Sequence, residues 1–183
     1  MSPLVVTKLH IPQPRTNIVL RKRLITRLTA GLEKRLILIS APARYGKTTL
    51  LGEWLSQEKQ NAAWISLDKR DNDPIRFWSY LLNALHQTFL SPQKYVFEVP
   101  NNLEIQVGET LLGALINELD QFSKRTILVL DDYHCIDNQS IHKNLAFLID
   151  NAPANFHLVI STRADPPFPL ARLRARSQMV RSG

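Results

Sequence analysis

The amino-acid sequence predicts an α/β fold in which a mainly parallel sheet lies between two layers of helices. Short, continuous apolar runs recur at residues 35–40, 62–67, 126–130 and 156–161, and such runs are typical of parallel strands that are covered on both faces. The segments between these runs have apolar residues at helical spacing, and strands that alternate with helices indicate a parallel sheet. The pattern does not determine the order of the strands.

The other elements follow from spacing and from end signals. Prolines at positions 3, 12 and 14 predict an extended arm over residues 1–18. A first helix is expected over 19–30, with Gly31 as its C-cap. Asp73 and Pro74 are expected as the N-cap and the first residue of a helix that runs to residue 89. Further helices are expected at 47–59, 104–122 and 141–151, and 91–102 is expected to be a loop.

The composition indicates one domain, or little more. The chain has 183 residues, of which 44% are hydrophobic and 21% charged, so it can bury a core and is not a wholly disordered chain. Its longest apolar run, 36–43, falls well short of the roughly 20 residues of a membrane helix, and its start lacks a secretory pattern. A single cysteine, Cys135, excludes an internal disulfide and a cysteine metal cage. We therefore expect a cytoplasmic protein without membrane contact.

The net charge of +7 at first suggests a nucleic-acid partner. Residues 1–35 hold eight Lys and Arg against one acid, 36–165 hold eleven against fifteen, and 166–183 hold four against none. A mildly acidic body therefore lies between two basic ends. A duplex-binding domain more often carries its basic residues on one element. We therefore interpret these ends as solvated faces or as contact surfaces for parts that are missing from this chain, and we expect no specific DNA binding.

The most specific motif follows the first apolar run. Residues 41–49 match the phosphate-loop pattern, with alanine in place of the first glycine, between a predicted strand and a predicted helix. Glycine lets the backbone approach phosphates, successive N–H groups form an anion-binding nest, and the helix N-terminus adds positive charge. A chance strand–turn–helix is the less favoured alternative. The expected nucleotide-binding residues are Ala41, Pro42, Ala43, Arg44, Tyr45, Gly46, Lys47, Thr48 and Thr49, with Lys47 on the β- and γ-phosphates and the Thr48 hydroxyl on Mg²⁺.

Two carboxylates end the third predicted strand. The carboxyl ends of parallel strands meet at the edge where the phosphate loop also lies, so Asp131 is expected as the Mg²⁺-side acid. Asp132 is expected to orient or activate the attacking water; the alternative is that it only caps the following turn. Arg163, after the fourth strand, is expected either to sense the γ-phosphate or to anchor a loop through Asp165.

Other reactive or bulky side chains have simpler interpretations. His134 and Cys135 have no metal or redox partner close in sequence, and a packed turn is favoured for them. Four aromatic residues are expected to belong to the core: Trp54, Trp64, Phe77 and Trp78.

Five blocks, at 40–49, 64–68, 71–80, 128–134 and 161–167, occur in an order that resembles a known family. Together with 7–12 and 169–174, they resemble the nucleotide-binding domain of MalT-like regulators, which are LuxR-type transcription activators of the STAND ATPase class. The resemblance covers almost the whole chain and implies a P-loop NTPase fold.

This resemblance implies a signal-dependent switch with ATP or ADP and Mg²⁺ as cofactors. In the family, the ADP-bound protein is a closed monomer, inducer and ATP open it to self-associate, and hydrolysis resets it. The resemblance places Val19 and Arg21 beside the adenine, although Arg21 is alternatively one of a solvated basic trio. It also implies an arm at 1–18, a nucleotide-binding domain at 19–167, and, at 168–183, the basic start of a helical and winged-helix extension.

Two features remain without a complete explanation. Arg44 stands where the family usually has glycine; a left-handed backbone there costs roughly 1 kcal/mol or more, although the guanidinium could also meet a phosphate. Asp68, Asp71 and Asp73 form a block whose role cannot be derived, apart from Asp73 as an N-cap.

The function expected from the sequence is an ATP- and Mg²⁺-binding switch with slow hydrolysis, from a transcription regulator whose sensor and DNA-binding parts are not in this chain. The alternatives are a stand-alone P-loop ATPase or kinase with Asp132 as base, a nucleic-acid binder that uses the basic ends, and a nucleotide-binding piece weakened by Arg44.

Overall fold

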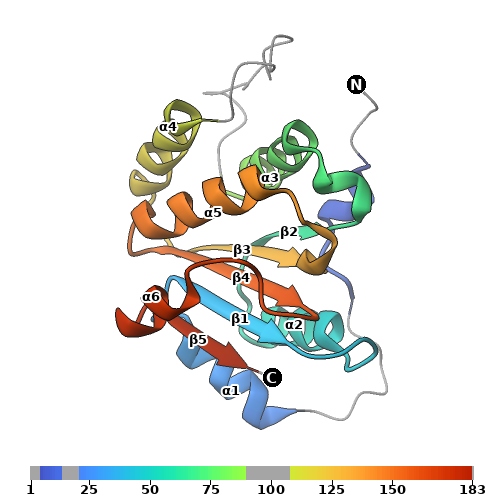
Figure 1. Ribbon diagram of the computed structural model, residues 1–183. Coiled ribbons are helices and arrows are strands. Elements are labelled where there is room, and N and C mark those ends of the chain that lie inside the picture. The colour runs from blue at the N-terminus through green and yellow to red at the C-terminus, as the bar shows by residue number, and fades with distance from the viewer. Residues whose placement is uncertain (1–4, 14–20, 90–107, 183) are drawn as a thin grey trace.

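The computed structural model describes residues 5–13, 21–89 and 108–182, and it contains one sheet with helices on both faces (Figure 1). The strands pair in the order β2-β3-β4-β1-β5, and every pair is parallel. They are β1 (Leu36–Ser40), β2 (Ala62–Ser66), β3 (Thr126–Asp131), β4 (Phe156–Thr162) and β5 (Met179–Ser182). The predicted three-layer α/β fold is confirmed.

Helices and single turns connect these strands. The α-helices are α1 (Lys22–Gly31), α2 (Lys47–Gln57), α3 (Pro74–Thr88), α4 (Glu109–Asp120), α5 (Gln139–Asn151) and α6 (Leu170–Ala175). The 3-10 turns are η1 (Val6–Leu9), η2 (Lys69–Asn72) and η3 (Tyr133–Cys135). In the described ranges, no helix has the length and apolar character needed to cross a membrane.

The two faces of the sheet carry separate hydrophobic cores because successive side chains of a strand point in opposite directions. On β1, Leu36 and Leu38 pack in the cluster shared with α3, α4, α5 and α6, whereas Ile37 and Ile39 pack with α1 and α2. Figure 1 shows α3 and α5 on one face of the sheet and α1 and α2 on the other. Helix α4 packs beside α5 on the first face. This two-sided burial is the reason that the strands appear as continuous apolar runs. The four core aromatics predicted from the sequence are all buried.

The sheet extends beyond residue 167, where the sequence analysis ended the domain. Strand β5 pairs with β1, with Met179 opposite Leu36, and α6 contributes Leu170 and Leu173 to the core. Arg172 and Arg174 of this basic stretch therefore belong to a helix with buried leucines, and Arg181 belongs to a strand. The fifth strand was missed because a four-residue strand with a central arginine lacks the continuous apolar run used to predict the others.

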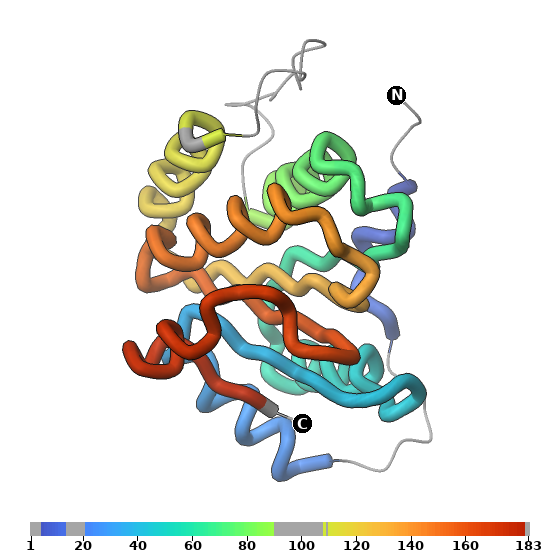
Figure 2. Tube along the Cα trace, viewed as in Figure 1, coloured from blue at the N-terminus to red at the C-terminus, as the bar shows by residue number. Residues whose placement is uncertain are grey.

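The first described segment is not simply extended, because it contains η1. Leu9 packs with the core on the α3 face and Ile11 with the core on the α2 face, so this segment passes from one face of the sheet to the other. It crosses at the edge strand β2, beside which η1 lies (Figure 2). It then meets α2, where the carbonyl oxygen of Pro12 would lie only 2.6 Å from a side-chain carbon added at Gly52.

Gly31 is not the C-cap that the sequence predicted. It is the last residue of α1, and Leu32 is the C-cap. A Cβ atom at position 31 would lie 2.8 Å from Cγ1 of Val180 and 3.0 Å from Cδ1 of Ile37. Gly31 therefore allows α1 to approach β5 and β1 closely.

We predict that Gly31→Ala lowers the free energy of unfolding by about 1–3 kcal/mol, because the added methyl group forces Val180 or Ile37 to move. Gly113→Ala is the matched control: a Cβ there has no neighbour within 4 Å. Gly113→Ala should raise the same quantity by about 0.5–1 kcal/mol because Gly113 lies inside α4. Urea unfolding measures both. Equal effects of the two substitutions would contradict the packing role of Gly31.

Candidate functional site

The carboxyl ends of β1, β3 and β4 lie together at one edge of the sheet, as parallel pairing requires. Strand β1 leads into residues 41–46, and the amide of Ala41 donates to the carbonyl oxygen of Thr162 at the end of β4 (3.3 Å). Asp131 ends β3, and Arg163 directly follows β4. The structure therefore brings the phosphate loop, the acid pair and Arg163 to the same edge.

Two residues of the phosphate loop have left-handed backbones. Gly46, directly before α2, has a φ of 71°, and Arg44 has a φ of 67°. Glycine adopts this conformation readily, whereas arginine is strained in it. The side chain of Arg44 is exposed, and the neighbouring Tyr45 is 59% exposed. The departure from glycine at position 44 therefore has the conformational cost expected from the sequence.

We predict that Arg44→Gly raises the free energy of unfolding by about 0.5–1 kcal/mol, since relief of left-handed strain exceeds the added freedom of the unfolded chain. Lys59→Gly is a suitable control because Lys59 is also exposed and has a φ of 49° at the end of α2. The control should be stabilised similarly. Loss of stability in Arg44→Gly alone would show that the arginine side chain makes stabilising contacts.

Lys47 and Thr48 begin α2 with side chains that point back to the edge of the sheet. Nζ of the buried Lys47 donates to the carbonyl oxygens of Ala41 (2.7 Å) and Pro42 (3.0 Å). The Thr48 hydroxyl donates to Oδ2 of Asp131 over 2.7 Å. The ammonium and the hydroxyl thus come from the first two residues of α2, and the carboxylate comes from the end of β3. The hydrogen bond between Thr48 and Asp131 joins these two elements.

Asp131 is a buried acid with incomplete compensation. Its exposed fraction is 2%, and Oδ1 has no hydrogen-bond partner of normal geometry in the described part of the chain. Burial raises the pKa of the carboxyl and the charge of Asp132 adds to this rise, whereas the hydroxyls of Ser161 and Thr48 lower the pKa. Burial is the largest of these effects, and no cation of the described residues forms an ion pair with the Asp131 carboxylate.

A divalent cation fits this position chemically. Mg²⁺ prefers oxygen ligands and is often held by one or two protein groups together with phosphate oxygens. Asp131 and Thr48 supply such a pair. Among the described residues, no three His, Cys, Asp or Glu side chains form a group that could hold a metal ion alone.

We predict that Asp131→Asn stabilises the nucleotide-free protein by about 0.5–2 kcal/mol, because asparagine removes a buried charge. A carboxyl whose pKa is raised by folding destabilises the fold once it ionises, so the advantage of the variant should grow as pH rises through that pKa. Thermal unfolding across a pH series measures this difference. An advantage that is greatest at low pH would contradict the argument.

Asp132 begins the turn after β3 in a left-handed conformation, with a φ of 57°. Its half-exposed carboxylate makes no capping hydrogen bond to η3, so the alternative that it only caps this turn is not supported. Nδ1 of His134 lies 3.7 Å from Oδ1 of Asp132. Burial lowers the pKa of His134, and the charge of Arg163 lowers it further, whereas Asp132 opposes this shift. These three side chains therefore share one electrostatic environment.

The remaining predicted site residues are placed as follows. Arg21 Nη1 donates to the carbonyl oxygen of Tyr45 over 2.9 Å, so this arginine contacts the phosphate loop rather than only solvent. Asp165 pairs with Arg181 (3.0 Å) and Arg174 (4.0 Å), which leaves the predicted Arg163–Asp165 anchor unsupported.

Thr49 is half-buried on α2, and Pro42 and Ala43 are exposed in the phosphate loop. Val19 lies outside the described residues. Cys135 Sγ lies 4.0 Å from Nε2 of His134.

Sequence reasoning missed the role of Asn72. Its Oδ1 accepts hydrogen bonds from the backbone amides of Asp137 and Asn138, each over 2.9 Å, and its Nδ2 donates to the side chain of Asp137. No sequence signal could have identified it, because Asp137 and Asn138 are more than sixty positions away. The predicted N-cap is confirmed: Oδ1 of Asp73 accepts from the amide of Arg76 over 2.8 Å.

Comparison with known proteins supports the family expected from the sequence. The chain is 35% identical over 179 residues to the HTH-type transcriptional regulator MalT of Vibrio parahaemolyticus, and 36% identical over 180 residues to that of Serratia proteamaculans. The chain is homologous to part of the MalT regulators. Each alignment covers 98% of this chain but only 20% of the relative, so the chain spans about a fifth of their length. No protein-family model matches the sequence.

Solved structures support the fold. Cdc6p from Pyrobaculum aerophilum aligns with a TM-score of 0.57 at 15% identity, over 97% of this chain and 49% of that one. A chain in the structure of Drosophila ORC bound to AT-rich DNA and Cdc6 aligns with a TM-score of 0.53 at 12% identity, over 88% of this chain and 52% of that one. At these identities the likeness concerns the fold alone.

Proposed function

We propose that this domain binds ATP or ADP with Mg²⁺ and acts as a slowly hydrolysing switch in a MalT-like transcription regulator. The observation that carries the proposal is the convergence of Lys47, Thr48 and Asp131 at the N-terminus of α2, behind a loop with a left-handed glycine. Homology to HTH-type transcriptional regulators supports the regulatory role.

Phosphate binding would use groups that are already in place. The Lys47 ammonium exchanges its two carbonyl partners for β- and γ-phosphate oxygens, and the loop amides and the N-terminus of α2 add further donors. Arg21, on the Tyr45 carbonyl, faces the same loop. The exposed guanidinium of Arg44 is free to reach a phosphate, which would offset its backbone strain.

Magnesium would be held by the Thr48 hydroxyl and the Asp131 carboxylate, and it would neutralise phosphate charge. Its binding would also supply the counter-charge that the buried Asp131 lacks. In the proposed reaction, Asp132 orients the attacking water and Arg163 senses the γ-phosphate, so hydrolysis resets the switch. Self-association of the longer protein in its ATP state and a cytoplasmic location belong to the same proposal.

The pairing of basic side chains supports this function over nucleic-acid binding. Arg172 pairs with Asp150, Arg181 pairs with Asp165, and Lys8 pairs with Asp68. Charges that are already compensated by neighbouring acids release few counterions on a phosphate backbone. We therefore propose no specific DNA binding by this domain.

We predict that Lys47→Ala abolishes ATP binding, because the variant loses the charge-assisted contacts to the β- and γ-phosphates. Isothermal titration with Mg-ATP measures the affinity, and Lys143→Ala, on the exposed face of α5, is the control that should bind like the wild type. Equal affinities of Lys47→Ala and the wild type would disprove the site assignment.

A further inference from the structure

We propose that Asn72 is a positioning residue for hydrolysis: it fixes the loop that carries Asp132, from a rigid turn at residues 68–73 that Lys8 and Arg76 lock in place. The inference rests on the proposed nucleotide function. It also gives a role to the acidic block that the sequence analysis left without one.

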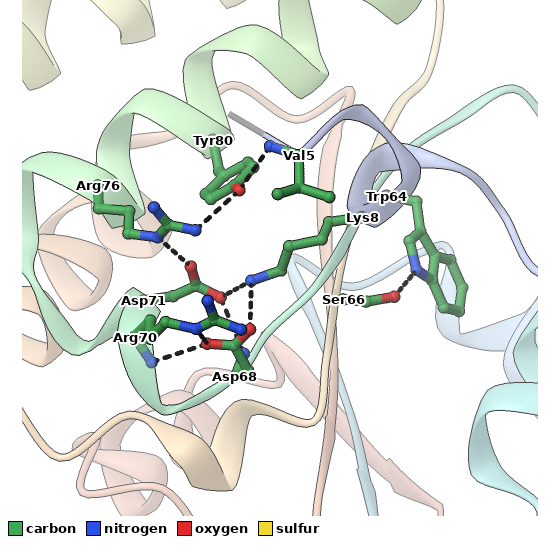
Figure 3. Close-up of polar contacts among 9 residues, drawn as sticks. All are labelled: Val5, Lys8, Trp64, Ser66, Asp68, Arg70, Asp71, Arg76 and Tyr80. Carbon is green, nitrogen blue, oxygen red and sulfur yellow. Dashed lines mark hydrogen bonds and ion pairs between the residues drawn. The ribbon is translucent and has the colours of Figure 1, made fainter. Parts of the chain in front are cut away.

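The turn at 68–73 is built around a fully buried carboxylate. Oδ2 of Asp71 accepts from the amide of Asp68 (2.8 Å) and from the ammonium of Lys8, and Oδ1 accepts from Nε of Arg76 (3.0 Å) (Figure 3). Oδ1 of Asp68 in turn accepts from the amide of Arg70 over 2.7 Å. Asp68 and Asp71 thereby form a capping box that closes η2 on itself.

Two cations from different elements compensate this buried charge. Lys8 comes from η1, before the first helix, and Arg76 comes from α3. Both lie over the ring of Tyr80, at 4.9 Å for Nζ of Lys8 and 5.2 Å for Cζ of Arg76, and the Tyr80 hydroxyl accepts from the amide of Val5 (2.9 Å). A buried charge with satisfied partners holds one arrangement, because any movement leaves the charge unpaired. The turn is therefore rigid.

This rigid turn and Leu67, the residue directly before it, hold both ends of the loop after β3. At the first end, the amide of Leu67 donates to the carbonyl oxygen of Asp131 over 3.0 Å. At the other end, Asn72 accepts from the amides of Asp137 and Asn138 and donates to the Asp137 carboxylate. The residues between these two attachments include Asp132 and all of η3.

The loop between these attachments requires such support. Asp132 has a φ of 57°, which a non-glycine residue keeps only where the surrounding structure enforces it. Its carboxylate has no capping bond of its own. A small displacement of a group that orients water lowers the rate of reaction without affecting groups that bind the nucleotide elsewhere. Asn72 therefore acts on Asp132 and not on the phosphate loop.

The test compares Asn72→Ala with an exchange of donor and acceptor, Asn72→Asp combined with Asp137→Asn. Alanine removes all three hydrogen bonds. The double variant keeps an oxygen for the two amides and restores the side-chain bond in the reverse direction, with the amide now at position 137. Asn151→Ala is the control, because the Asn151 side chain also bonds the backbone: its Nδ2 donates to the carbonyl oxygen of Phe147 on α5.

We expect Asn72→Ala to lower the single-turnover rate of Mg-ATP hydrolysis at least tenfold while the affinity for Mg-ATP stays within twofold of the wild type. The double variant should recover to within about threefold of the wild-type rate, and the control should be unchanged. An unchanged rate in Asn72→Ala, an equal loss of rate and affinity, or no recovery in the double variant would each overturn the proposal.

Hydrogen exchange of the nucleotide-free protein supplies a readout that does not depend on hydrolysis. The amides of residues 133–138 should exchange at least tenfold faster in Asn72→Ala and return to the wild-type rate in the double variant. Unchanged exchange in Asn72→Ala would overturn the positioning role even if the wild type binds nucleotide. Failure of the wild type to bind any nucleotide would instead contradict the proposed function, and the exchange result would still decide whether Asn72 fixes the loop.

Discussion

Parallel pairing of β1, β4 and β3 is the constraint on which the candidate site depends. Parallel strands place all their carboxyl ends at one edge, and residues that follow different strands meet there without any local signal between them. The phosphate loop follows β1, Asp131 ends β3 and Arg163 follows β4. The hydrogen bond between Thr48 and Asp131, which are 83 positions apart, is a direct result of this arrangement. Burial of both faces of the sheet keeps the strands in register, because each strand contributes side chains to both cores.

Asp71, which follows β2, and Asp131, which ends β3, are both buried, but their charges are compensated differently. Asp71 has two cations and a backbone amide as partners, whereas Asp131 accepts from the Thr48 hydroxyl and has no ion pair among the described residues. A compensated buried charge fixes a structure, and an uncompensated one is unfavourable until a cation arrives. The first arrangement suits a rigid support and the second suits a binding site. Both arrangements occur where the parallel strands end, one after β2 and one at the end of β3.

The charge of +7 has a different meaning once the side chains are placed. At the C-terminal end, three of the four arginines pair with Asp150 or Asp165. At the other end, Lys8 is held by the acids of the 68–73 turn, and Arg21 contacts the phosphate loop. The basic ends therefore join the chain to its own acidic body through these pairs.

The layers, most of the strands and the phosphate-loop motif could be predicted from the sequence alone, because these depend on local periodicity and on contiguous residues. The sequence also indicated the conflict at Arg44, since the strain of an arginine with positive φ is a property of one residue. Strand β5 and the roles of Gly31, Asn72 and Asp71 were decided only by the tertiary structure. Each depends on a partner far along the chain: β1 for β5, Val180 for Gly31, Asp137 for Asn72 and Lys8 for Asp71. Hydrogen bonds, ion pairs and close packing act over a few ångströms in space, so a sequence pattern reveals them only where the partners are also neighbours in the chain.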